Sequence, residues 1–182
     1  ASINGDGTTN TTVLGGLMHT NQGTVNGCST DIWLSQGGVY TGGLVGINKG
    51  LISNSSATGA VDGINSTGGL IGSNWGTVDT SYATGLVWAS GVDTGGLIGE
   101  NRGFIRNTYA KGEVVGLNNV GGLVGRSDEF NSEGKNAYIN LSYATGKVTV
   151  TNSVGNNYVA GIVGYNDGWV QYCYYDKDTT GR

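Results

Sequence analysis

Residues 67–87 read Thr67-Gly-Gly-Leu-Ile-Gly-Ser-Asn74-Trp-Gly-Thr-Val78-Asp-Thr-Ser-Tyr82-Ala-Thr-Gly85-Leu-Val87. This segment contains three short apolar runs, which glycine and asparagine separate. None of the runs is long enough for a helix, and their β-branched residues favour strands. The segment therefore predicts short β-strands joined by tight corners, where the glycines and asparagines are expected to supply positive φ.

The glycine pair of this segment recurs along the chain at a nearly constant spacing. A Gly-Gly-Leu triplet begins at positions 15, 42, 68, 95 and 121, so the steps are 27, 26, 27 and 26. Residues 160–162, Ala-Gly-Ile, form a sixth, degenerate copy. Such a period is typical of a solenoid, in which each repeat contacts only its neighbours. We therefore expect an all-β fold, a parallel β-solenoid (β-helix) of about six coils with roughly three short strands in each coil.

Residues 1–182 are expected to form a single domain, with coils starting near residues 13, 41, 67, 94, 120 and 159. Each coil adds the spacing between paired strands, roughly 4.8 Å, so six coils make a rod roughly 29 Å long. The fifth repeat is clearly longer than the others, since its glycine pair lies at position 121 and the next copy begins only at 160. Because insertions into a solenoid map to surface loops, the extra residues predict surface insertions around 126–137 and 150–157.

Equivalent positions of the repeats stack into columns in such a fold. Two aliphatic columns are predicted to form the core, together with Val61, Val87, Val114 and Val148. The first column contains Leu17, Leu44, Leu70, Leu97, Leu123 and Ile162. The second column contains Val25, Ile52, Val78, Ile105, Ile139 and Val170. The column that directly follows the first is not expected in the core, because neighbouring residues on a flat strand face opposite sides. It contains Met18, Val45, Ile71, Ile98, Val124 and Val163.

Two further columns are polar or aromatic. One is predicted to be a corner ladder in which stacked amides bond coil to coil. It contains Asn21, Asn48, Asn74, Asn101 and Asn166. The other holds tyrosines that would stiffen the rod by stacking or offer a stripe for sugars, and stacking is the interpretation we favour. It contains Tyr82, Tyr109, Tyr143 and Tyr174.

The repeats resemble a known family. Gly-Gly-Leu-Val-Gly-x-Asn-x-Gly followed by Tyr-Ala-Thr-Gly-x-Val is similar to the GLUG repeat of bacterial surface and secreted proteins, best at residues 42–61, 68–87, 95–114 and 121–148. Residues 172–181 also resemble the segment that closes such arrays. The family's repeats occur in adhesin-like proteins and in immunoglobulin A-cleaving metallopeptidases, outside the catalytic part. The resemblance implies a bacterial or archaeal extracellular protein with a structural or adhesive role, and it implies no reaction.

The charge and composition of the chain argue against certain classes of binding partner. The net charge is −4, the pI is near 4.7 and only 12% of the residues are charged. An acidic chain with so little charge argues against nucleic acid and anionic membrane as partners. No run is long or apolar enough to span a bilayer, so we expect no membrane insertion. Abundant serine, threonine and asparagine are typical of extracellular surfaces, and we expect the protein outside the cell or on the cell surface.

Cys28 and Cys173 are the two cysteines, and they occupy the same repeat position in the first and last coils. Five coil steps separate them by roughly 24 Å. A disulfide requires Cα atoms within about 7 Å, so the two should not pair within one molecule. If molecules stacked end to end in register, Cys173 of one copy would lie one strand spacing from Cys28 of the next. Two small residues filling a serine and threonine column are the alternative.

Known catalytic and metal motifs do not match this chain. His19 is the only histidine, so a His-Glu-x-x-His motif and a Cys/His zinc cluster are excluded. The acidic residues are scattered over different repeat positions, unlike the carboxylate clusters of polysaccharide-active enzymes. We therefore expect no enzymatic activity, no catalytic residues and no cofactor. Asp167, Asp176 and Asp178 could offer oxygens to Ca²⁺, but their spacing matches no calcium loop well.

These observations predict an extracellular structural or adhesive protein whose copies stack end to end into a fibre. The alternative is an adhesin module that binds glycans or host proteins without self-assembly. Its candidate binding loop contains Arg126, Asp128, Glu129, Phe130, Glu133 and Lys135. Ice binding and polysaccharide-cleaving activity are less well supported, because the threonine columns are broken and the acidic residues do not cluster.

Overall fold

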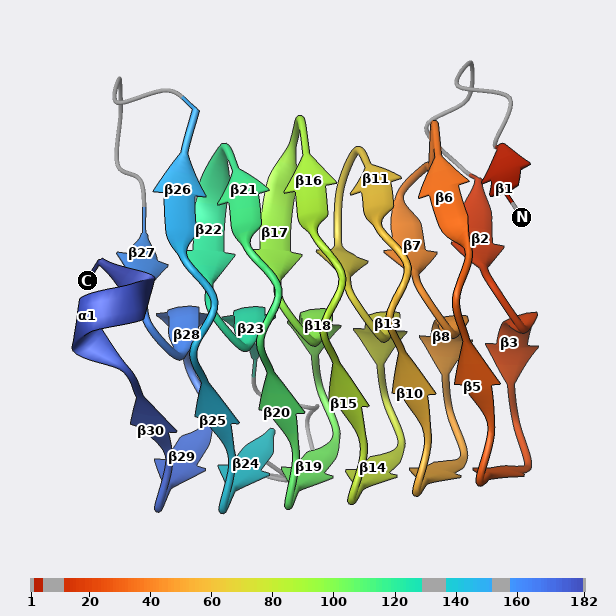
Figure 1. Ribbon diagram of the computed structural model, residues 1–182. Coiled ribbons are helices and arrows are strands. Elements are labelled where there is room, and N and C mark those ends of the chain that lie inside the picture. Colours follow the sequence, from red (N-terminus) through yellow and green to blue (C-terminus); the bar gives the residue numbers. More distant parts are fainter. Residues whose placement is uncertain (1, 5–11, 129–136, 152–157, 182) are drawn as a thin grey trace.

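The computed structural model describes residues 2–4, 12–128, 137–151 and 158–181, with the backbone alone for residues 2–4. The chain forms a parallel β-solenoid of six coils, as the repeat period predicted (Figure 1). Each coil has five strands, however, so the expectation of roughly three strands was wrong. The strands are only two to four residues long, and bends of a few residues separate them. Several of these bends fall within motifs that look continuous in the sequence.

Equivalent strands of the six coils pair into five parallel sheets, here named A to E in chain order. Sheet A contains β1 (Ser2–Asn4), β6 (Trp33–Ser35), β11 (Val61–Gly63), β16 (Val87–Ala89), β21 (Val114–Gly116) and β26 (Val148–Val150). Sheet B contains β2 (Val13–Gly15), β7 (Tyr40–Gly42), β12 (Thr67–Gly68), β17 (Val92–Gly95), β22 (Asn118–Gly121) and β27 (Val159–Ala160). Sheet C contains β3 (Met18–Asn21), β8 (Val45–Asn48), β13 (Ile71–Asn74), β18 (Ile98–Asn101), β23 (Val124–Ser127) and β28 (Val163–Asn166).

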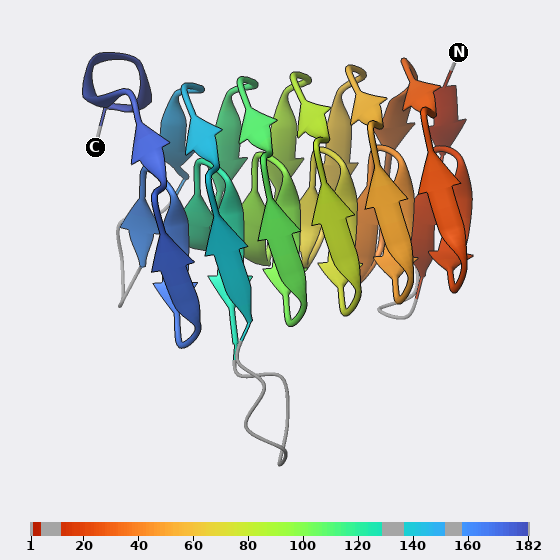
Figure 2. The same cartoon turned by 90° about the horizontal axis from the view of Figure 1, so that it is seen from below.

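Sheets D and E complete each coil. Sheet D contains β4 (Thr24–Asn26), β9 (Leu51–Ser53), β14 (Thr77–Asp79), β19 (Phe104–Arg106), β24 (Tyr138–Asn140) and β29 (Trp169–Gln171). Sheet E contains β5 (Ser29–Thr30), β10 (Ser56–Ala57), β15 (Tyr82–Ala83), β20 (Tyr109–Ala110), β25 (Tyr143–Ala144) and β30 (Tyr174–Tyr175). The helix α1 (Lys177–Thr180) follows β30 at the C-terminal end of the rod (Figure 2).

The strand register turns the sequence period into straight columns. Val78, for example, pairs with Ile52 in the preceding coil and with Ile105 in the following one. The insertion in the fifth repeat does not shift the register, because Ile105 pairs with Ile139 and Ile139 with Val170. Each coil therefore presents the same repeat positions to the core and to solvent.

The core contains both predicted columns and the column that we had excluded. Leu44, Leu70, Leu97 and Leu123 are fully buried, and so are Ile52, Val78, Ile105 and Ile139. Val45, Ile71, Ile98 and Val124 are also fully buried, which corrects the prediction. Each leucine lies in the bend between sheets B and C, not on a flat strand, so consecutive residues can both face inward. Val61, Val87, Val114 and Val148 are buried as predicted.

The predicted core columns open to solvent at the two ends of the rod. Leu17 in the first coil is 44% exposed, and Val170 in the last coil is 37% exposed. Ile162 is partly buried against the core. These residues occupy core positions in the first and last described coils, where no further described coil packs over them.

Most glycines of the repeat are required for close backbone approach, and positive φ is not their role. A Cβ added to Gly99 of β18 would overlap the backbone of Ser66 and Thr67, which belong to the preceding coil. A Cβ on Gly96 would overlap the carbonyl oxygen of Gly122 in the following coil. Among the described glycines, only Gly27 and Gly181 have positive φ. The glycine columns therefore allow sheets B and C to pack backbone to backbone.

Most residues with positive φ are not glycines. This differs from our expectation that the glycines supply positive φ at the corners. At the corner between sheets D and E, every coil places one residue in the left-handed region. These residues are Gly27, Asn54, Thr80, Asn107, Leu141 and Tyr172. Asparagine tolerates this conformation well, whereas leucine and tyrosine do so at a cost that the surrounding ladders must offset.

The asparagine column forms the predicted ladder at a corner. The side-chain Nδ2 groups of Asn21, Asn48 and Asn74 each donate to the Oδ1 of the next asparagine, all at 2.8 Å, and the run ends at Asn101. Each amide also bonds backbone groups two residues further along its own coil, as Asn74 does with Gly76. The ladder is interrupted in the fifth coil, where Ser127 stands between Asn101 and Asn166.

The C-terminal segment covers part of the last coil. The ring of Tyr175 lies against Gly161 of the last coil. In the preceding coils, the equivalent glycine is covered at this point by the glycine backbone of the coil that follows. Asp176 then caps α1, since its Oδ1 accepts hydrogen bonds from the backbone N–H groups of Asp178 and Thr179. Thr180 is fully buried, and Gly181 ends the helix in the left-handed conformation. Residues 172–181 thus form a cap on the last described coil, in keeping with their resemblance to a closing segment.

We expect Gly99→Ala to destabilise the protein by about 2 kcal/mol or more, because its methyl group would push sheet C away from the backbone of Ser66. Gly23→Ala is the matched control, since a Cβ at Gly23 meets no atom within 4 Å and its φ is not positive. Its stability should change by less than about 1 kcal/mol. Urea unfolding followed by circular dichroism measures both, and equal effects of the two variants would contradict the close-approach role.

Candidate functional site

Two residues of the predicted binding loop, Arg126 and Asp128, fall within the described part of the chain. Glu129, Phe130, Glu133 and Lys135 lie outside the described residues. Arg126 belongs to β23, and Asp128 follows that strand at the start of the insertion. The Nε of Arg126 donates to Oδ1 of Asp128 at 2.7 Å.

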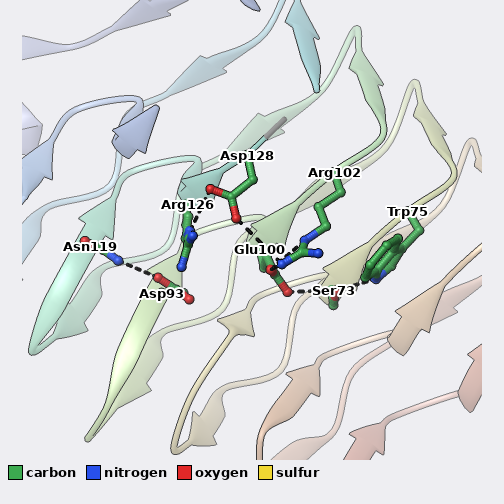
Figure 3. A network of polar contacts seen from close by, with 8 residues as sticks. All are labelled: Ser73, Trp75, Asp93, Glu100, Arg102, Asn119, Arg126 and Asp128. Atoms are coloured by element: carbon green, nitrogen blue, oxygen red, sulfur yellow. Dashed lines mark hydrogen bonds and ion pairs between the residues drawn. The ribbon is translucent and has the colours of Figure 1, made fainter. Parts of the chain in front are cut away.

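Arg126 and Asp128 belong to a polar network that links three coils along sheet C (Figure 3). Arg102 contacts Oε1 of Glu100 at 2.7 Å through Nη2, and it lies 3.7 Å from Asp128. Glu100 accepts a hydrogen bond from Ser73 Oγ at 3.2 Å, and Ser73 Oγ accepts one from the indole of Trp75 at 3.0 Å. The guanidinium of Arg102 also lies over the Trp75 ring, 4.6 Å from its centroid.

This network fixes neighbouring coils to one another. Glu100 is only 5% exposed and Asp128 8%, so their charges are largely removed from water. Such carboxylates are stable only when they are paired, and here arginines pair with both. Because the carboxylate oxygens are engaged in these contacts, we interpret the network as a structural link between neighbouring coils. It does not resemble a pair of free acid and base groups.

Unlike Glu100 and Asp128, Asp93 forms no ion pair with an arginine among the described residues. It is 6% exposed, and its Oδ1 accepts a hydrogen bond from Asn119 Nδ2 at 2.6 Å. Burial raises the pKa of Asp93 above its ordinary value, and the hydrogen bond and the positive charge of Arg126 offset this only in part. A raised pKa means that the charged form is destabilised by folding.

A polar hollow of about 220 Å³ lies beside the network. Its lining contains Asn118, Asn119, Arg126, Tyr158 and Tyr165. The Tyr158 and Tyr165 rings meet edge to face at 5.3 Å, and the Arg126 guanidinium lies 5.6 Å from the Tyr165 centroid. Arg126, one of the two described residues of the predicted loop, therefore lines a polar hollow.

A second surface, which the sequence analysis missed, lies on the outer side of sheet D. Three aromatic residues follow one another there in the last three coils, namely Phe104, Tyr138 and Trp169. A groove of about 410 Å³ runs beside the first two of them. Comparing the residue that precedes each Val25-column residue would have revealed this row, because its members share that repeat position.

The tyrosine column of sheet E has the structural role that we favoured. The rings of Tyr82 and Tyr109 stack at 4.7 Å with an interplanar angle of 2°, and those of Tyr109 and Tyr143 stack at 5.0 Å with an angle of 10°. Tyr174 pairs in register with Tyr143 and is 69% exposed. Since the stacked rings use their faces against one another, this column is poorly suited to sugars.

The two cysteines are free thiols at opposite ends of one column, whose other members are Ser55, Ser81, Thr108 and Ser142. The hydroxyls in this column bond from coil to coil, as when Ser55 Oγ accepts from the backbone N–H of Cys28 at 3.1 Å. Cys173 Sγ–H donates to the carbonyl of Gln171 at 3.3 Å. Burial raises the pKa of the Cys173 thiol, which disfavours the reactive thiolate.

In the described part of the chain, no three histidine, cysteine, aspartate or glutamate side chains gather as a metal site would require. Of the three acids considered for Ca²⁺, Asp176 caps α1 and Asp167 is exposed. His19 is exposed and contacts Thr20 Oγ1 at 2.7 Å. Among the described residues, no helix has the length and apolar character that crossing a membrane requires.

Comparison with known proteins identifies the repeat. Residues 37–62 match the family model described as the GLUG motif. The match begins just after one sheet A strand, β6, and ends within the next, β11, so it spans one coil. The resemblance stated from the sequence is therefore confirmed for this segment. Neither the curated proteins nor the solved structures yielded a match to the chain.

We expect Asp93→Asn to increase stability at pH 7, because an amide keeps the Asn119 contact without burying a charge. Since the folded state raises the Asp93 pKa, this residue contributes most to stability at low pH and loses that contribution as pH rises through the folded pKa. The gain from the variant should therefore shrink as pH falls toward about 4. Urea unfolding at both pH values measures the change.

Asp79→Asn is the control variant, for which we expect the opposite change in stability at pH 7. Burial would raise the pKa of Asp79, but hydrogen bonds from Asn107, Arg106 and Thr80 lower it below its ordinary value. This carboxylate therefore stabilises the protein at pH 7 and loses that effect as pH falls, so the variant should cost up to about 1 kcal/mol at pH 7. A loss of stability at pH 7 in both variants would contradict the opposite pKa shifts of Asp93 and Asp79.

Proposed function

We propose that this chain is a rigid structural and adhesive module of an extracellular or cell-surface protein. The observation that carries the proposal is the continuity of five six-stranded parallel sheets through all six coils. GLUG repeats are typical of surface and secreted proteins, and the solenoid fold is compatible with such a structural repeat protein. The role is mechanical, since the rod holds its side faces in a fixed arrangement.

The stiffness of the rod follows from the contacts between coils. Backbone hydrogen bonds join each coil to the next on five faces, and the asparagine ladder adds buried side-chain bonds along the same axis. In such a quasi-one-dimensional fold, bending must disturb several ladders at once. A protease needs an extended, unpaired segment, so paired strands are poor substrates.

The adhesive part of the proposal rests on the contrast between the interior and the outer faces. The inward column of sheet D holds only valine and isoleucine, from Val25 to Val170. The outward column beside it changes from Thr24 and Leu51 to Phe104, Tyr138 and Trp169. An interior that repeats while the outer face varies allows a binding surface to be built without changing the scaffold.

End-to-end stacking into a fibre is the second candidate, and specific features of the end coils favour it. An apolar hollow of about 430 Å³ opens at the C-terminal end, and its lining includes Val159, Ile162 and Val170. Exposed Leu17 lies in the first coil, so both ends present apolar core residues. Cys28 and Cys173 lie in one column at opposite ends, as a disulfide between stacked copies would require.

The Tyr175 ring weighs against in-register stacking. Because it lies against Gly161, it fills the space that the glycine backbone of a following coil would take. A second copy could continue all five ladders only if this ring and α1 moved aside. For this reason the isolated module is the function we place first.

Two measurements on this protein test the proposal together. Antibodies to the chain should label intact cells of the source organism, and labelling only after lysis would contradict the extracellular role. Electron microscopy of the purified chain should show separate short rods, with the same gel mobility under reducing and non-reducing conditions. Filaments with a reducible ladder of multimers would replace the isolated module with the stacked fibre.

A further inference from the structure

The outer face of sheet D carries two parallel rows of side chains in its last three coils. Phe104, Tyr138 and Trp169 form an aromatic row, and each pairs in register with the next. Two residues further along the same strands, Arg106, Asn140 and Gln171 form a polar row. Successive members of each row are one coil apart, about 4.8 Å along the rod.

We propose that this two-row face, including the groove beside Phe104 and Tyr138, binds a neutral polysaccharide chain that lies along the rod. The inference deepens the adhesive role proposed above, on which it rests, and does not depend on whether the molecules stack. The groove is lined by Thr77, Phe104, Ile105, Arg106, Tyr138 and Asn140.

The aromatic row has ring surface available for a ligand. Phe104 is 48% exposed and Trp169 is 55% exposed. The Phe104 and Tyr138 centroids are 6.4 Å apart with an angle of 55° between the planes, so these two rings do not cover one another's faces. The stacked tyrosines of sheet E differ in this respect, because their near-parallel rings cover one another.

Two members of the polar row, Arg106 and Gln171, are held in place by neighbouring side chains. Arg106 Nη2 contacts Asp79 Oδ2 at 2.8 Å, which orients the guanidinium while leaving its side chain 60% exposed. Tyr138 donates its hydroxyl hydrogen to Gln171 Oε1 at 3.1 Å, so the amide of Gln171 keeps its N–H groups for another acceptor. The Oδ1 of Asn140 is buried without a hydrogen-bond partner among the described residues.

These two rows match the chemistry of a pyranose chain. A sugar ring has an apolar face of C–H groups, which packs on aromatic rings, and a rim of hydroxyls, which bond amides and guanidinium groups. One coil spacing is comparable to the length of one sugar residue, so a chain along the rod could meet a ring and a polar group in each coil. The Asp79 carboxylate balances the charge of Arg106, and the protein as a whole is acidic, which favours a neutral polymer over an anionic one.

The test is native gel electrophoresis of the full chain in gels that contain hydroxyethylcellulose, glucomannan or xylan. We expect retarded migration in at least one of these gels. Phe104→Ala and Trp169→Ala should each weaken binding about tenfold or more, because each removes a stacking surface. Asn140→Ala should also weaken it, since it removes the amide from the groove.

Trp33→Ala is the matched control, because Trp33 is 58% exposed on sheet A, away from the two-row face. It should migrate as the parent does, and urea unfolding should show that the surface variants keep their stability. The inference is overturned if none of the three gels retards the parent, or if Phe104→Ala and Trp169→Ala bind as tightly as Trp33→Ala. Either result would leave the antibody labelling of intact cells unaffected, so the extracellular role is tested separately.

Discussion

The close approach of two backbones is the constraint on which this structure depends. Sheets B and C meet without side chains between them, because glycine occupies the contact position in successive coils, as Gly72 and Gly99 do. With this contact made, the bend between the sheets directs two consecutive aliphatic residues inward, as with Leu97 and Ile98. The same bend recurs at each Gly-Gly-Leu triplet, so the contact repeats along the rod and sets the register of every other column.

The repeat period was sufficient to predict the solenoid, the number of coils and most of the core. It could not predict five strands per coil, because bends of only a few residues have no distinctive sequence pattern. The second inward column was missed for a related reason. The rule that neighbours alternate holds on a flat strand, whereas Leu44 lies in a bend before Val45. The glycines were recognised as important, but their role is spatial, and only the positions of neighbouring coils reveal it.

The candidate binding surface was harder to predict than the fold. Phe104, Tyr138 and Trp169 are farther apart in the sequence than the regular repeat step, because insertions separate them. They become neighbours only through the strand register. The predicted loop residues Arg126 and Asp128 proved to belong to the polar network that joins neighbouring coils. The sequence alone does not reveal which charged residues of one coil lie close to those of the next. A scaffold with a fixed interior and variable outer columns is compatible with the structural and adhesive role that we propose.

The central claim is that each coil is an interchangeable unit held in register by equivalent neighbours. Deletion of residues 68–94 tests it most directly, because it removes one complete repeat and joins Thr67 to Gly95, which restores the Thr-Gly-Gly-Leu sequence. We predict a shorter rod that keeps its β-sheet circular dichroism and unfolds cooperatively. Deletion of residues 68–80 removes half a coil and should abolish folding. If the two deletions had the same effect on folding, the account of stacked, register-dependent coils would be contradicted.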